Sequence, residues 1–145
     1  MDYKTPESVL VVVHTDERVL LLQRADNPCF WQSVTGSLEV NETPEMTAKR
    51  ELCEETSIIH AQLTDAQLQH CYAIHPSWRH RYHPSVRENK EHVFFAKLDA
   101  VTKIVLSPKE HLAYQWLSPE EAVEQCFSET NKDAIRRVFS LSIGK

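Results

Sequence analysis

The residues best suited to chemistry in this sequence are three glutamates in one short segment. Glu54 and Glu55 follow Glu51 by three and four positions, so an α-helix would bring the three carboxylates within reach of one another. Such a cluster is repulsive unless a cation balances it. Mg²⁺ suits this task because it binds a few carboxylate oxygens, keeps some of its waters and accepts phosphate oxygens. The cluster therefore predicts a Mg²⁺ site, which Mn²⁺ can also fill, that acts on a phosphate compound.

A solvated acidic helix face is the competing interpretation. Arg50 and Glu54 have the i,i+4 spacing of a surface ion pair, and charged strings of this kind usually lie in solvent. Taken alone, the string favours this simpler interpretation. The longer pattern in which it lies has to decide between the two.

The element that must carry the glutamates is predicted as a helix from Pro44 to about Thr56. Thr43 is suited to the N-cap, and proline is well tolerated at the first helical position because its missing N–H would have no partner there. Gly36 precedes this helix and is one of only two glycines in the chain. So scarce a residue is expected where the backbone geometry requires it.

The remaining elements are predicted from hydrophobic patterns and capping signals. A hairpin at the sheet centre is expected over 9–14 and 18–24, further strands at 68–74, 92–98 and 113–117, a capping box opening a helix at Ser118, and a last helix over 132–141. Strands and helices mix without regular alternation, which predicts an α+β fold with a mixed sheet between helices (α/β/α). The length suits a single domain over residues 1–145.

Composition excludes several classes of partner. The net charge of −5 leaves no basic field for polymer nucleic acid, and the longest apolar run, Val9–Val13, is too short to span a membrane. The four cysteines form no CxxC pair, which fits a reducing cytoplasm. We therefore expect a cytoplasmic monomer or weak homo-oligomer that acts on a small molecule.

The longer pattern is similar to a known family motif. The sequence reads Gly36-x5-Glu42-x7-Arg50-Glu51-Leu52-x-Glu54-Glu55-x-x-Ile58. This resembles the Nudix box, GX5EX7REUXEEXGU with U an apolar residue, and departs from it only at Ser57, where the family has glycine. The departure affects the turn that ends the helix, since glycine there normally supplies a left-handed conformation at little cost. The metal ligands all precede it.

The resemblance implies the Nudix fold and a role for each matching residue. Glu51, Glu54 and Glu55 are expected to bind Mg²⁺ together with the carbonyl of Gly36. Arg50 is expected to pair with Glu42 and to hold the catalytic helix against the preceding loop. The implied chemistry is in-line attack on phosphorus by a metal-activated water.

Three further segments are similar to one Nudix subgroup, the bacterial dihydroneopterin triphosphate pyrophosphohydrolases, also described as dATP pyrophosphohydrolases. They are 26–37, 79–82 and 110–117. By this resemblance Glu110 is a further metal ligand or the catalytic base, and Lys4, Arg24 and Thr35 lie near the substrate phosphates. Surface or strand-end roles remain open for each of these residues.

Substrate contacts are also expected from the segment that ends the strand at 68–74 and begins the long loop at 75–87. Tyr72 to His75 combine aromatic rings with free backbone groups, which suits contact with a flat heterocycle. Long loops in compact domains are often functional. Tyr72 and His75 are therefore candidate substrate-binding residues.

The subgroup resemblance implies hydrolysis of dihydroneopterin triphosphate, and of dATP, to the monophosphate and pyrophosphate, an early step toward folate. Two alternatives remain open. The chain could serve another Nudix substrate, such as a dinucleoside polyphosphate or a damaged nucleotide, or it could be a noncatalytic nucleotide-binding module. The second alternative is disfavoured because such modules usually lose glutamates of the box, and all are present here.

Overall fold

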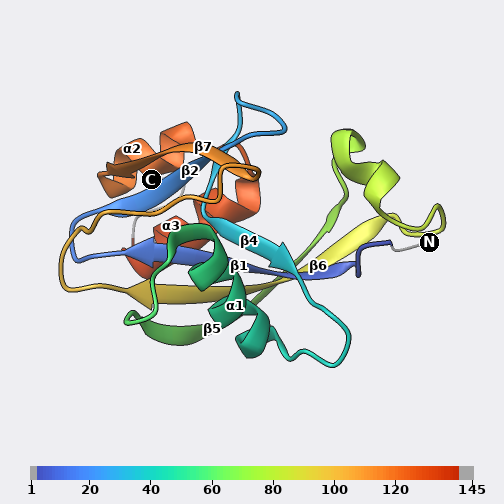
Figure 1. The fold of residues 1–145 in the computed structure, drawn as a ribbon, viewed down its shortest axis with the longest axis horizontal. Coiled ribbons are helices and arrows are strands. Elements are labelled where there is room, and N and C mark those ends of the chain that lie inside the picture. The colour runs from blue at the N-terminus through green and yellow to red at the C-terminus, as the bar shows by residue number, and fades with distance from the viewer. Residues whose placement is uncertain (1–2, 141–145) are drawn as a thin grey trace.

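A computed structural model describes residues 3–140 and shows one mixed β-sheet with helices on both sides (Figure 1). The elements in chain order are β1 (Glu7–His14), β2 (Val19–Arg24), β3 (Trp31–Gln32), β4 (Val34–Ser37), α1 (Pro44–Thr56), β5 (Gln62–Ala73), the 3-10 helix η1 (Pro76–Arg81), β6 (Glu88–Lys97), β7 (His111–Leu117), α2 (Pro119–Gln125) and α3 (Glu129–Val138). The predicted α+β class and the sheet between helices are confirmed.

The sheet is organised around β1. This strand pairs antiparallel with β4 and parallel with β6, and β6 in turn pairs antiparallel with β5. β2 pairs instead with β3 and β7. The predicted hairpin of β1 and β2 is therefore closed only next to its turn, where His14 is in register with Val19. The two strands separate beyond it because the edge of β1 that would face β2 is taken by β4.

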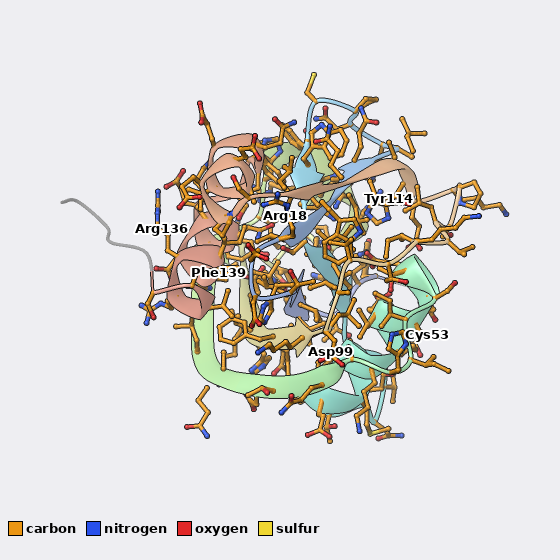
Figure 2. The ribbon with its side chains drawn as sticks, turned by 90° about the vertical axis from the view of Figure 1, so that its left-hand side faces the viewer. Arg18, Cys53, Asp99, Tyr114, Arg136 and Phe139 are labelled. Atoms are coloured by element: carbon orange, nitrogen blue, oxygen red, sulfur yellow. The ribbon has the colours of Figure 1, made fainter. Side chains whose placement is uncertain are left out.

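Two hydrophobic clusters attach the helices to opposite faces of the sheet. Alternation along β1 sends Val9 and Val11 into the cluster that contains Leu52 of α1, and sends Leu10 into the cluster that contains Ile135 of α3. In the side view of Figure 2, Cys53 on α1 and Arg136 on α3 mark these opposite sides. The sheet thus separates α1 from α2 and α3.

The ends of α1 follow the predicted capping chemistry. The Thr43 hydroxyl accepts a hydrogen bond from the backbone N–H of Met46, and Pro44 occupies the first turn. At the other end Ser57 adopts the left-handed conformation, with φ 65° and ψ 14°, and its N–H donates to the Cys53 carbonyl at 2.8 Å. A residue with a Cβ therefore occupies a position that favours glycine.

Other boundaries differ from the prediction by a few residues. β5 begins at Gln62 rather than at 68, and a bulge between Asp65 and Leu68 interrupts its alternation. α3 begins at Glu129, with Ser128 as N-cap, and the predicted end of this helix at 141 lies outside the described residues. No helix within residues 3–140 is long and apolar enough to cross a membrane.

The conformation of Ser57 predicts that Ser57→Gly stabilises the protein by up to about 1 kcal/mol, because glycine removes the left-handed penalty at the end of α1. Chemical denaturation of the metal-free protein measures this change. Ser57→Ala is the matched control, since alanine keeps the Cβ and should bring no gain. Equal stability of the glycine and alanine variants would contradict the prediction.

Candidate active site

Two adjoining pockets lie where α1, β4, η1 and β7 come together. The carboxylate pocket, of about 270 Å³, is lined by three glutamates, Glu51, Glu55 and Glu110, and by Asp26. The larger pocket, of about 450 Å³, extends from it toward β5, β6 and the start of α3. Both pockets are lined by the same six residues, which are Lys4, Arg24, Gln32, Thr35, Gly36 and Arg81. One extended molecule could therefore occupy both.

Helical spacing places Glu51 and Glu55 on the buried side of α1, where their residues are only 8% and 2% exposed. Gly36 on β4 lies directly against the first of them, and a Cβ at this glycine would come within 1.6 Å of Glu51 Oε2. Any larger residue would displace the carboxylate. The scarce glycine is thus explained by this close approach rather than by a turn.

The two buried carboxylates are only partly balanced within the described residues, since Arg50 Nη1 lies 3.5 Å from Glu51 Oε2 while no lysine or arginine forms an ion pair with Glu55. Glu51 Oε1 and Glu55 Oε1 are both buried without a hydrogen-bond partner. Burial raises the pKa of Glu51 to about 7, and burial together with the neighbouring Glu51 charge raises the pKa of Glu55 well above its usual value. His111 Nε2 lies 3.8 Å from Glu55 Oε1, but burial lowers the pKa of this histidine to about 4. A neutral imidazole cannot compensate these charges.

These carboxylates fit a divalent cation. Their unpartnered oxygens are the hard donors that such ions prefer, and Glu110 adds a third carboxylate to the same pocket. Within residues 3–140 no three His, Cys, Asp or Glu side chains are already gathered as a closed set of ligands. An open arrangement still suits an ion that keeps several waters and shares substrate oxygens.

Glu54 and Arg50 occupy different positions from the other two glutamates of the cluster. The Glu54 side chain is 51% exposed and receives a hydrogen bond from Arg50 at 3.3 Å. Neither residue lines the carboxylate pocket. The expectation that all three glutamates share one face therefore holds only in part, because one residue of helix turns Glu54 by about 100° from Glu55 toward solvent.

Arg50 links α1 to the loop and strand before it. Its Nε and Nη2 donate to the two carboxylate oxygens of Glu42 at 2.8 and 2.9 Å, and Nη2 also reaches the Ser37 carbonyl at 3.2 Å. This bidentate contact lowers the pKa of Glu42 to about 2. The expected Arg50–Glu42 pair is present, and it holds the glutamate helix against β4.

Cationic side chains also line the carboxylate pocket. Lys4, Arg24 and Arg81 all line it. Asp26 joins the two arginines, since it accepts from Arg24 at 2.7 and 2.6 Å and from Arg81 at 3.1 Å. The guanidinium of Arg24 also lies 4.3 Å from the ring centroid of Trp78. These contacts fix two cations beside the carboxylates, an arrangement that suits phosphate oxygens.

Glu110 reaches the site through strand pairing. It directly precedes β7, which pairs antiparallel with β2, and its carbonyl accepts from the Ala25 N–H at 2.9 Å. The structure thereby brings Glu110, which the subgroup resemblance singled out, to the pocket of Glu51 and Glu55. Thr35 and Gly36 lie between them on β4, where Gln32 Nε2 donates to the Thr35 hydroxyl at 3.1 Å.

The larger pocket has aromatic walls. Tyr72 and His75, the two predicted heterocycle contacts, both line it, and Trp78 and Phe127 complete the aromatic surface. His75 lies 5.2 Å from Trp78 between ring centroids. The pocket is therefore bounded by planar groups that can contact a flat ring.

Several residues of the site carried no functional assignment at the level of sequence. Asp26 and Arg81 lie in the segments 26–37 and 79–82, which are similar to the Nudix subgroup. That similarity was the only sequence feature that could have identified them as site residues. Phe127, Asn89 and Glu91 lie outside every quoted segment, yet all three line the larger pocket. No local pattern distinguishes them from ordinary strand and loop residues.

Comparison with known proteins agrees with this geometry. The NUDIX domain family profile matches residues 4–138. The chain is 43% identical over 148 aligned positions to the dihydroneopterin triphosphate diphosphatase of Haemophilus influenzae, covering 97% of this chain and 92% of that protein. It is 44% identical over 141 positions to the Escherichia coli K12 protein of the same name, covering 93% of each.

A solved structure gives the same result in three dimensions. The E. coli dihydroneopterin triphosphate pyrophosphohydrolase superposes with a TM-score of 0.92 at 40% identity, covering 98% of this chain and 100% of that one. Members of the family generally use divalent metal ions. With the glutamate helix, the unbalanced carboxylates and a profile that spans nearly every described residue, the chain belongs to the Nudix family and is a Nudix hydrolase.

Proposed function

We propose that this enzyme hydrolyses dihydroneopterin triphosphate to its monophosphate and pyrophosphate, with Mg²⁺ as the metal and dATP as a second substrate. The observation that carries the proposal is the continuity of the two pockets, which share Arg24, Thr35 and four further residues. A triphosphate can extend into the carboxylate pocket while its heterocycle lies in the larger one. The two bacterial relatives with more than 40% identity carry this activity in their names.

The proposed metal ligands are Glu51, Glu55 and Glu110 with Glu54 at the edge of the site and the carbonyl of Gly36. A bound Mg²⁺ polarises phosphate oxygens and makes a coordinated water more acidic. Glu110 is a ligand of that ion or the base that takes the proton of the attacking water. Its position in the turn before β7 lets it reach the pocket from a segment separate from α1.

The remaining residues bind and orient the substrate. Lys4, Arg24 and Arg81 balance the charge of the phosphates, and the Thr35 hydroxyl can donate to a phosphate oxygen. Tyr72 and His75 contact the ring. Arg50 acts indirectly, because its bonds to Glu42 and Ser37 keep Glu51 at the pocket.

The wider setting follows from the same assignment. We place the reaction in folate biosynthesis, in a single domain over residues 1–145. A reducing compartment such as the cytoplasm suits the four cysteines, all of which are free thiols. Mn²⁺ should replace Mg²⁺, since both accept carboxylate and phosphate oxygens.

The unbalanced carboxylates predict opposite effects of Glu55→Gln on activity and stability. Turnover should fall by at least about 1000-fold, because a neutral amide is a poor ligand for a hard cation. In EDTA the variant should melt at a higher temperature than the wild type at pH 7. The pKa of Glu55 is raised in the folded state, so its ionised form costs stability above the unfolded pKa, and glutamine removes that cost.

Glu45→Gln is the matched control for this experiment, since Glu45 is an exposed residue of the same helix. Mg²⁺ should raise the melting temperature of the wild type and of the control. The increase for Glu55→Gln should be much smaller. Turnover near the wild-type level in Glu55→Gln would remove Glu55 from the proposed metal site.

The proposed cleavage position predicts the products. With dihydroneopterin triphosphate or dATP, pyrophosphate and the monophosphate should appear in equal amounts, and orthophosphate should form only after inorganic pyrophosphatase is added. Chromatography of the nucleotides together with a phosphate assay measures this. Accumulation of dADP with orthophosphate would place cleavage at the terminal linkage and reject the assignment.

Because Glu110 lies in the carboxylate pocket, we predict that Glu110→Gln lowers kcat by about 100-fold or more and changes KM much less. The interaction that glutamine removes belongs mainly to the transition state. Steady-state kinetics at saturating Mg²⁺ measures both constants. Glu120→Gln, an exposed residue of α2, is the control. Matching, unimpaired kcat values in the two variants would remove Glu110 from the chemistry.

A further inference from the structure

The floor of the larger pocket carries polar groups that the hydrolytic chemistry does not use. Asn89 and Glu91 lie two residues apart on β6, so their side chains point to the same face of the sheet. Both line the larger pocket and are only 3% and 4% exposed. A carboxylate and an amide buried this deeply need partners or a ligand.

The Asn89 amide leaves its oxygen free. Its Nδ2 donates to the Ser8 hydroxyl at 2.7 Å and to the Tyr72 hydroxyl at 3.1 Å, while Oδ1 is buried with no partner among the described residues. Tyr72 donates its own hydrogen to Glu91 Oε2, at 3.4 Å, and can therefore only accept from Asn89. This direction of bonding fixes the amide with its oxygen unpaired.

The Glu91 carboxylate also has unused acceptor capacity. Its two protein contacts are long, at 3.3 Å from His70 Nδ1 to Oε1 and 3.4 Å from the Tyr72 hydroxyl to Oε2. An ionised carboxylate can accept about four hydrogen bonds. Glu91 and Asn89 thus form an acceptor floor, a name used here for their three side-chain oxygens.

The three oxygens of the acceptor floor favour binding of a ring whose facing edge carries hydrogen-bond donors. A 2-amino-4-oxopyrimidine edge, which pterins and guanine share, presents an amino group beside a ring N–H and so offers N–H groups side by side. Adenine presents its amino group beside a ring nitrogen that accepts. A carboxylate pairs with the first edge through two parallel bonds but meets the adenine nitrogen with repulsion.

We propose that Glu91, supported by Asn89, is the residue that selects a 2-amino-4-oxopyrimidine ring over adenine in the larger pocket. The proposal rests on the proposed function, since it assigns the ring end of the same triphosphate. It differs from a purely structural role, in which Glu91 only ties β6 to His70 of β5, whose Nε2 contacts Asp133 of α3 at 3.0 Å.

Substitution by glutamine separates the two roles. Glu91→Gln keeps the shape of the side chain but offers one acceptor and one donor, the pair that complements adenine. The ratio of kcat/KM for dihydroneopterin triphosphate to that for dATP should fall by about tenfold or more, because a mispaired polar edge loses most of its discrimination. The ratio of dGTP to dATP should fall with it, since guanine shares the edge.

Two control variants accompany this measurement. Glu88→Gln makes the same chemical change at an exposed position of the same strand and should leave both ratios unaltered. His70→Gln removes the partner of Glu91 from outside the pocket and should change stability without changing the ratios. If Glu91→Gln does not fold, Glu91→Asp retracts the carboxylate by one carbon and should show a smaller fall in the same ratios.

The outcomes distinguish the inference from the function on which it rests. An equal loss for all three substrates in the Glu91 variants, or ratios that match the wild type, would overturn the selecting role and leave Glu91 as a structural residue. A wild-type protein that releases no pyrophosphate from any of the three would instead reject the proposed function. A fall in kcat/KM for dihydroneopterin triphosphate and dGTP that exceeds the fall for dATP supports the selecting role of Glu91.

Discussion

The burial of Glu51 and Glu55 beside the backbone of β4 is the constraint on which the rest of the site depends. Moving a carboxylate out of water costs on the order of several kcal/mol, and here two of them lie close together. The protein carries this cost at one place and compensates with packing elsewhere. Gly36 provides the space for Glu51, and Arg50 keeps the helix at the required distance by binding Glu42 and Ser37. The buried carboxylates thus lower the stability of the free protein, and binding of a cation and a phosphate at this site can offset that loss.

The charges around this centre come from segments that the sheet brings together. Arg24 ends β2, Arg81 ends η1 and Glu110 precedes β7. Asp26 joins the two arginines through hydrogen bonds, and the Ala25 N–H donates to the Glu110 carbonyl. Asp26 thus pairs with both arginines, whereas Lys4, Arg24 and Arg81 line the pocket of Glu51, Glu55 and Glu110 without an ion pair to these glutamates within residues 3–140. This separation keeps both available to a triphosphate.

The two pockets are built largely on different parts of the fold. The carboxylate pocket depends on α1 and on Glu110, whereas the larger pocket depends on β5, β6 and the segment before α3. Residues such as Glu91 and Phe127 can vary without disturbing the helix that carries Glu55. This division explains how one scaffold can serve different substrates with the same chemistry.

The sequence alone determined the glutamate helix through the local spacing of its residues. The three- and four-residue intervals from Glu51, the capping pair Thr43 and Pro44, and the position of Ser57 specify the glutamate helix and both of its ends, because these interactions span less than two turns. The placing of Glu110, Lys4 and Arg24 near that helix could be anticipated only through resemblance to a family. Only the tertiary structure decided that β4 separates β1 from β2, that Glu54 lies outside the carboxylate pocket, and that Asn89 and Glu91 line the larger pocket. These outcomes depend on which strands pair along one edge of the sheet and on which faces are buried. Both involve segments far apart in the sequence, so residue spacing within one segment does not predict them.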